Sequence, residues 1–241
     1  MTAGHFGFAA VVKSRESRVP LWAIMLSTYL LDIVFIFLVS AGIESFASIN
    51  PSNPSYGDAI IHAYYSHSLL GALIISIIAG IAANWKWNKR AGMVIGGVAF
   101  SHWILDLIVH RPDLPILPGN AGNLPLLGFG LWNIPIASGL FELVLVATGA
   151  YLYYKCALNA PKANNEKGTK PIRAFIAAGT TGICMLLLFI SDVFSISLGL
   201  SLLLILLLIV LCGWLDSRLG WNSKTKDKEL KPRAEADNNS R

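Results

Sequence analysis

Three ionisable side chains recur at four-residue steps within one apolar stretch, SHWILDLIVHRPDLP, which runs from Ser101 to Pro115. They are His102, Asp106 and His110. Because a four-residue step turns only about 40° around an α-helix, these side chains should form one stripe on a single helix face. Imidazole and carboxylate groups on a buried stripe favour a metal site or a path for protons.

Further ionisable residues lie inside other apolar stretches, where each costs free energy in a membrane unless it has a partner or a function. Counting along the expected helices brings Asp32, His67, His102 and Glu142 to a similar depth near the membrane midplane. His5 lies in an N-terminal segment, HFGFAAVV, that is apolar enough to fold back into the helices. The metal ligands that we expect are these histidines and carboxylates: His5, Asp32, His62, His67, His102, Asp106 and Glu142.

Four residues toward the outer surface are candidates for chemistry beside the metal: His62, His110, Arg111 and Asp113. His110 and Asp113 could move protons or orient a substrate, and the Arg111 guanidinium could hold a phosphate. His62 and His67 are five residues apart, which separates them by about 140° on a regular helix. Both can serve one site only if that helix is distorted or if one of them supports another ligand.

The types of ligand indicate the metal. Histidine and carboxylate ligands without cysteine suit Zn²⁺, or Mn²⁺ if carboxylates predominate. Such an ion activates water as a nucleophile and polarises a phosphoryl or acyl oxygen, and two ions about 3.5 to 4 Å apart are common in phosphoester hydrolysis. The cysteines, Cys156, Cys184 and Cys212, are isolated in the sequence and predict neither a disulfide nor a cysteine metal site.

The elements that must position these residues are membrane helices. The chain is 54% hydrophobic and 14% charged, which is typical of a polytopic membrane protein. Runs long enough to cross about 30 Å of hydrocarbon as helices lie at residues 20–43, 58–83, 90–110, 131–154, 172–190 and 193–214. We therefore predict an all-α fold with six transmembrane helices.

Lysine and arginine gather between alternate apolar runs and in the tail. By the positive-inside rule, this pattern places both termini on the cytoplasmic side of the membrane. The net charge of +5 therefore reflects membrane orientation, and we expect no nucleic-acid partner.

The chain divides into five expected segments. A re-entrant N-terminal segment (1–19) precedes a four-helix core with the metal site (20–155), a cytoplasmic loop (156–171), a two-helix apolar scaffold (172–214) and a disordered charged tail (215–241). The loop over residues 111–130 is rich in Pro, Gly and Leu and could form a lid or a lipid-facing rim.

Two motifs resemble those of a known family. HAYYSHSLLGALI, from His62 to Ile74, and the stretch from Ser101 to Pro115 resemble the His-rich element and HxxxD helix of the YdjM-like family of inner-membrane-associated metal-dependent hydrolases. His5 and Asp32 are similar to that family's opening His and first-helix Asp, so the resemblance covers about residues 1 to 145. It implies metal-dependent hydrolysis at the inner membrane.

The sequence also departs from that family's pattern. Ser66 stands where the family usually has threonine, His62-Ala63-Tyr64 replaces an HRG-like triplet, and Leu31-Asp32 replaces Pro-Asp. These departures leave the expected ligand atoms in place, and they bear on the residues that would contact a substrate.

A more distant resemblance is to the zinc-dependent phospholipase C and single-strand nuclease group. His102 and Asp106 match its HxxxD pair, and Asp32 is similar to its early Asp. The later HxxxE pair has Ser138 in place of His before Glu142, so a complete three-ion site is not implied. This likeness implies phosphoester chemistry.

Three hypotheses follow. The leading one is hydrolysis of a phosphoester in a membrane lipid or lipid-linked substrate by a metal-activated water. The first alternative is a transporter or channel for a metal ion or protons, against which the lack of an evident broken-helix pair counts. The second is a non-catalytic membrane scaffold.

Overall fold

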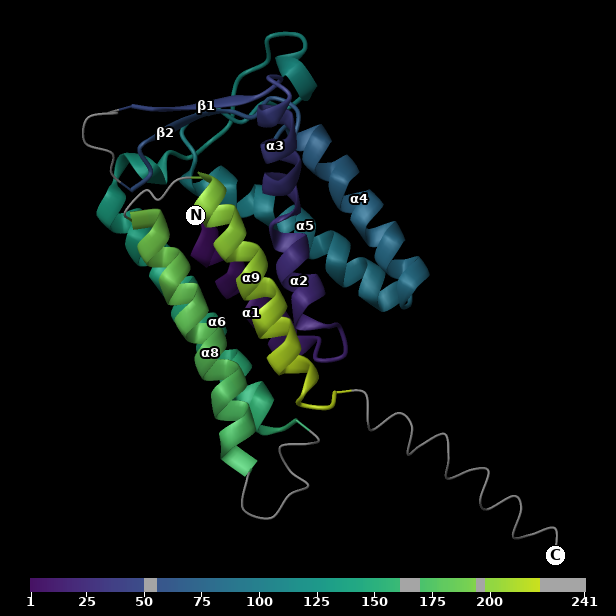
Figure 1. Cartoon of the computed structure of the whole chain (residues 1–241). Coiled ribbons are helices and arrows are strands. Elements are labelled where there is room, and N and C mark those ends of the chain that lie inside the picture. Colours follow the sequence, from purple (N-terminus) through teal and green to yellow (C-terminus); the bar gives the residue numbers. More distant parts are fainter. Residues whose placement is uncertain (50–55, 161–169, 194–197, 222–241) are drawn as a thin grey trace, which may run out of the picture.

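The computed structural model describes residues 1–49, 56–160, 170–193 and 198–221. This part is mostly helical, with a small antiparallel sheet at one end of the helical bundle (Figure 1). Helices long and apolar enough to cross a membrane are α4 (Leu69–Lys86), α5 (Lys89–Val109), α6 (Pro135–Leu158) and the Ile172–Ser191 part of α8 (Lys170–Val193). The prediction of a helical protein with membrane-type helices is confirmed.

The described residues support four spans, or five if a bent pair of helices is counted as one span. That pair is α2 (Leu21–Thr28) and α3 (Leu30–Ser40), which meet at 49° around Tyr29. In α9 (Leu198–Ser217), the apolar part described, Leu202–Ser217, is shorter than a full span. Six spans and the orientation in the membrane therefore stay predictions.

The prediction of a helix over residues 58–83 is wrong for its N-terminal part. Strand β2 (Ala59–His62) pairs there with β1 (Ser45–Ser48), and α4 begins only at Leu69. The helix begins at this point because the Ser68 hydroxyl caps it by accepting a hydrogen bond from the Gly71 N–H. A short apolar run can form a strand or a helix, and hydropathy does not separate the two.

Helix α1 (Thr2–Arg15) lies among the other helices, with most of its residues buried. It packs closely against α6, where Gly7 meets Gly149. A Cβ atom on Gly7 would lie 2.6 Å from the Leu145 carbonyl oxygen, and one on Gly149 would collide with the Gly7 carbonyl. The two glycines therefore allow backbone-to-backbone contact, which fixes α1 within the bundle.

A buried ion pair fixes the C-terminal half of α1. The Lys13 ammonium lies 2.9 Å from a carboxylate oxygen of Asp216 on α9, and the other oxygen of Asp216 accepts from the Tyr153 hydroxyl and the Trp221 indole. Most of the predicted loop (156–171) and tail (215–241) lies outside the described residues, although α9 extends to Ser217.

Candidate metal centre

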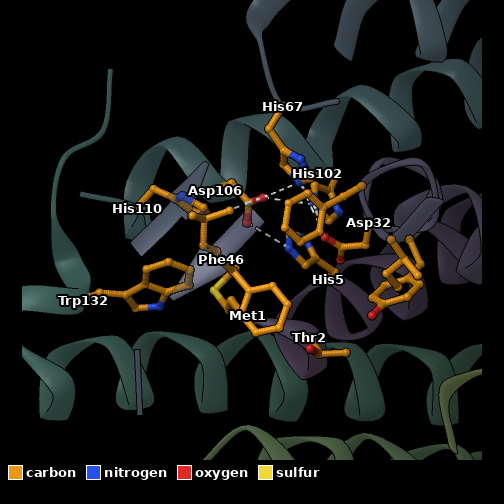
Figure 2. A pocket seen from close by; sticks show the side chains of 14 residues that line it. Met1, Thr2, His5, Asp32, Phe46, His67, His102, Asp106, His110 and Trp132 are labelled. Carbon is orange, nitrogen blue, oxygen red and sulfur yellow. Dashed lines mark hydrogen bonds and ion pairs between the residues drawn. The ribbon is translucent and has the colours of Figure 1, made fainter. Parts of the chain in front are cut away.

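His and Asp side chains from α1, α3, α5 and the turn before α4 converge in one cavity of about 180 Å³ (Figure 2). Two overlapping groups could hold a metal ion: His5, His102 and Asp106 form one, and Asp32, His67 and His102 form the other. All five residues were among the predicted metal ligands. The cavity lies at the end of the bundle that carries the β1–β2 hairpin, since Phe46 and Ile61 also line it.

The bend between α2 and α3 positions two parts of this site. Thr28 is the last residue of α2, so its carbonyl belongs to the groups that a helix end leaves without an intrahelical partner. The His102 Nδ1 lies 2.6 Å from this carbonyl oxygen. Asp32 lies in the first turn of α3 and brings its carboxylate toward the same imidazole, with Oδ1 at 3.7 Å from Nε2.

The bond to Thr28 sets the protonation of the His102 ring. A carbonyl oxygen only accepts hydrogen bonds, so Nδ1 of His102 carries the proton and donates it. In the neutral ring, Nε2 then presents a lone pair to the cavity. This is the arrangement in which a histidine binds a metal through one nitrogen while the other nitrogen is held by a second group.

His67 is held in the same way through two further residues. The Ser66 hydroxyl donates to Glu44 Oε2 at 2.8 Å, so it accepts from His67 Nδ1 at 2.9 Å. Glu44 is buried, and its Oε1 also accepts from the backbone N–H groups of Tyr65 and Ser66. This chain leaves the Nε2 lone pair of His67 facing the cavity.

His110 follows the pattern with a carboxylate as its partner. Its Nδ1 donates to Asp113 Oδ1 at 2.9 Å, and its Nε2 lies 3.8 Å from Asp106 Oδ2. The Trp132 ring packs beside the imidazole, with centroids 4.3 Å apart. His110 and Asp113 therefore form an oriented pair at the edge of the cavity.

The resulting cluster is rich in lone pairs. The Nε2 atoms of His67 and His102 are 3.3 Å apart, and Asp106 Oδ2 lies 2.9 Å from the second of them. Since both Nδ1 atoms hold the ring protons, neither Nε2 donates to the other while the rings are neutral. A bound cation or added protons must offset this concentration of acceptors and negative charge.

His5 approaches the cluster from α1. Its Nε2 lies 3.1 Å from Asp106 Oδ1, and its ring stacks on His102 with centroids 3.9 Å apart. Its buried Nδ1 has no hydrogen-bond partner among the described residues. Because His102 offers only Nε2, the two candidate groups compete for that one atom.

Glu142 was predicted to bind the metal, but its side chain is not among those that line the cavity. Its Oε1 accepts from the backbone N–H of Gly4 at 2.9 Å, and its Oε2 accepts from the Tyr56 hydroxyl at 2.6 Å. A carboxylate at the N-terminus of a helix is favourable, because the helix dipole is positive there. Glu142 therefore holds the end of α1 that carries His5, and it does not line the cavity.

His62 and Arg111 also lie outside the cavity lining. His62 is exposed on β2, where its Nδ1 lies 3.2 Å from the Tyr64 hydroxyl. Arg111 donates to the side chain of Asn133 and to the Gly57 carbonyl. The question of how His62 and His67 share one helix face does not arise, because both precede α4.

Sequence reasoning missed Thr28, Glu44 and Ser66 as supports of the ligands. Glu44 follows the first apolar run and looks like an ordinary loop charge, and it is 22 residues from Ser66. No spacing rule connects residues that meet only through the fold. The weak signal available was the Ser66-His67 pair, in which a hydroxyl precedes a candidate ligand.

Comparisons with protein-family models, curated proteins and solved structures gave no match. The resemblance to the YdjM-like family therefore stays a prediction from short motifs.

Proposed function

We propose that this protein is a membrane-embedded, metal-dependent hydrolase in which Asp32, His67, His102 and Asp106 bind a divalent ion. The observation that carries the proposal is the spacing of four ligand atoms, Nε2 of both histidines, Asp32 Oδ1 and Asp106 Oδ2. The five separations between them that involve a histidine range from 2.9 to 3.7 Å. Three of these atoms, Nε2 of both histidines and Asp32 Oδ1, belong to one candidate group and lie 3.3 to 3.7 Å apart. Ligand atoms spaced by about 3.3 Å at the corners of a tetrahedron lie about 2.0 Å from its centre, which is the Zn–N and Zn–O bond length. Asp106 belongs to the other candidate group, and its Oδ2 lies 2.9 Å from His102 Nε2.

Zinc is the ion that this donor set suits best, and Mn²⁺ is the alternative. Bound there, such an ion would acidify water to a nucleophile and polarise a phosphoryl oxygen. The remaining chemistry belongs to the chain. His110, with Nδ1 tied to Asp113, presents Nε2 beside Asp106 and is placed to take a proton from water or to give one to a leaving group.

The proposed substrate is a phosphoester of a lipid or lipid-linked molecule, and the proposed location is the bacterial inner membrane. Two apolar membrane-type elements, α5 and the bent α2–α3 pair, contribute residues to the cavity, which supports a substrate that resides in a membrane. A mixed set of imidazole and carboxylate ligands around a borderline ion is compatible with phosphoester chemistry, in which the ion polarises a phosphoryl oxygen.

A metal-ion transporter is the second candidate, and the bend between α2 and α3 favours it. The sequence has no evident pair of broken helices, but the structure has this one bent element, and broken helices often form the ion sites of transporters. On the other side of the cluster, however, Phe6, Ala9, Ala10 and Ile24 are buried and apolar. They belong to one hydrophobic core, which counts against a polar path through this part of the described bundle.

The experiment compares wild-type protein with His102→Ala and a matched control, His62→Ala, which removes an exposed imidazole outside the cavity. Purified protein is reconstituted in liposomes that contain phosphatidic acid, and phosphate release, metal content and metal flux are measured. We expect phosphate release and bound metal in the wild type and in His62→Ala, and neither in His102→Ala. Bound metal with flux but no hydrolysis of any lipid phosphoester would support the transporter instead.

A further inference from the structure

The residues that line the cavity are of two kinds, polar and apolar. Asp and His side chains make up the polar part of the lining, and Tyr29, Phe35, Ile36, Phe46 and Ile61 make up much of the rest. None of the described residues that line the cavity is lysine or arginine. A soluble polyanion such as a nucleotide would therefore meet no lysine or arginine side chain there, while an amphiphile would meet apolar side chains beside polar ones.

Exposure shows on which side this cavity opens. The Asp32 side chain is 26% exposed, whereas those of His67, His102 and Asp106 are almost fully buried. Ile36 follows Asp32 by four residues, so the two side chains lie on the same face of α3. The mouth of the cavity is therefore on the α3 side.

The hairpin forms the other rim of this mouth. Phe46 on β1 and Ile61 on β2 are directly paired across the strands, so their side chains lie on one face of the hairpin. Both line the cavity, and Phe46 is 48% exposed. Figure 2 shows Phe46 at the cavity together with Met1 and Trp132.

The mouth lies beside a helix whose outer surface is apolar. Only Leu31 and Phe35 of α3 are buried, and Phe37 is 70% exposed. Helix α3 is half of a bent helix pair that is long and apolar enough for a membrane, so this uncovered apolar surface suits contact with lipid. An opening at its edge is thus reached from the bilayer.

The size of the cavity limits what it can enclose. Its volume of about 180 Å³ is below the roughly 300 to 1,000 Å³ of pockets that enclose a drug-sized ligand. A phosphate-sized head group fits a space of this kind, and a lipid chain must remain outside it.

We propose that a membrane lipid approaches sideways through the mouth formed by Ile36, Phe46 and Ile61, with its phosphate in the cavity and one acyl chain against these side chains. This inference rests on the proposed function for the identity of the head group. It assigns Ile36, Phe46 and Ile61 as residues that determine specificity for an apolar chain.

The test uses full-length protein in phosphatidylcholine nanodiscs that contain a phosphatidic acid with a photoreactive diazirine on one acyl chain. After illumination, mass spectrometry locates the labelled peptides. We expect labelling of the segments around Ile36, Phe46 and Ile61. Phe46→Gln should reduce that labelling about tenfold, because it replaces a large apolar contact with an amide. Ile36→Ser, which changes a residue on α3 instead of β1, should also reduce the labelling.

The matched control is Phe129→Gln, which changes a phenylalanine that is 77% exposed and lies outside the cavity lining. It should label as the wild type does, and all three variants should retain wild-type metal content because none removes a ligand. Equal labelling in Phe46→Gln, Ile36→Ser and Phe129→Gln would overturn the proposed mouth.

Two further outcomes separate this inference from the proposed function. Labelling at the mouth without phosphate release would support the lipid path while the hydrolase proposal fails. Hydrolysis of the soluble ester p-nitrophenyl phosphate at a rate that added phosphatidic acid does not reduce would overturn the lipid path while the hydrolase proposal stands.

Discussion

Two buried polar clusters lie toward opposite ends of α1, and they are built in opposite ways. In the first, Lys13 lies 2.9 Å from Asp216 and also donates to the Ser17 and Val19 carbonyls. Asp216 in turn accepts from the Tyr153 hydroxyl. Opposite charges, donors and acceptors are matched within the chain, so this cluster is complete without a ligand.

The second cluster, around His102 and Asp106, is not matched in this way. Three of its histidines, His102, His67 and His110, use their Nδ1 protons on Thr28, Ser66 and Asp113, and their Nε2 atoms face carboxylates. No lysine or arginine is among the described residues that line the cavity. The comparison teaches that burial and charge alone do not mark a site. The absence of matching donors distinguishes a candidate binding centre from a structural network.

The largest expected effect comes from removing a ligand of the unmatched cluster. Asp106→Ala should abolish stoichiometric metal binding, because Asp106 Oδ2 lies within 4 Å of Nε2 of His67, His102 and His110. Elemental mass spectrometry on detergent-purified protein measures the bound metal, with circular dichroism to confirm the fold. A folded Asp106→Ala protein with full metal content would break the comparison.

The opposite result is expected from the matched cluster. Asp216→Ala leaves the Lys13 ammonium buried without its carboxylate, so we expect the free energy of unfolding to fall by about 3 to 5 kcal/mol. Thermal unfolding in detergent tests the loss. Metal content per folded molecule should stay at the wild-type value, and loss of metal in parallel with stability would show that the clusters are one functional unit.

A smaller effect is expected from the supports of His67. Ser66→Ala and Glu44→Gln should each weaken metal affinity by about 10- to 100-fold, because the Nδ1 proton of His67 loses its acceptor or that acceptor loses its orientation. Competition with a chromophoric zinc chelator measures the affinity. Ser66→Thr keeps the hydroxyl and should bind metal nearly as well as the wild type, so equal weakening in Ser66→Thr and Ser66→Ala would exclude the hydrogen-bond explanation.

The smallest effect concerns an exposed ion pair at the far end of the bundle, between Glu16 and Arg90. The hydrogen bonds from the Arg90 guanidinium hold the pKa of the Glu16 carboxyl below its ordinary value. The stabilisation that this ion pair gives the folded protein is thus present above the unfolded-state pKa of glutamate. It is lost as the pH falls through the lower pKa of Glu16 in the folded state. Glu16→Gln should lower the thermal midpoint slightly at pH 7 in low salt and not at pH 3, with metal content unchanged. A large fall in the thermal midpoint at both pH 7 and pH 3 would contradict the interpretation of Glu16 and Arg90 as a surface ion pair.

The helical stripe and the inward fold of His5 could be predicted from sequence, because period and apolarity are local properties. His102, Asp106 and His110 do lie along one stretch that ends α5, and the carboxylate of Asp106 lies within 4 Å of both imidazoles. Counting residues along a helix predicted the depth of Glu142 in the membrane. It could not predict which neighbouring helix the side chain faces. That carboxylate faces the first turn of α1.

Two other features depend on contacts that no local pattern encodes. The strand at Ala59–His62 exists because residues 45–48 pair with it. The first residues of an apolar run expected to be helical therefore form a strand, and Ile61 of this strand lines the cavity. The link from Glu44 through Ser66 to His67 likewise needs the end of α3 to reach the turn before α4. Both features required the fold.

Zinc K-edge X-ray absorption on purified, zinc-loaded protein tests the central claim most directly. The account predicts a four-coordinate shell of nitrogen and oxygen at about 2.0 Å with outer-shell scattering from two imidazole rings. The imidazole signal should fall by half in His67→Ala protein that still holds zinc. Wild-type protein that binds no zinc, or binds it in an oxygen-only shell without imidazole scattering, would contradict the account.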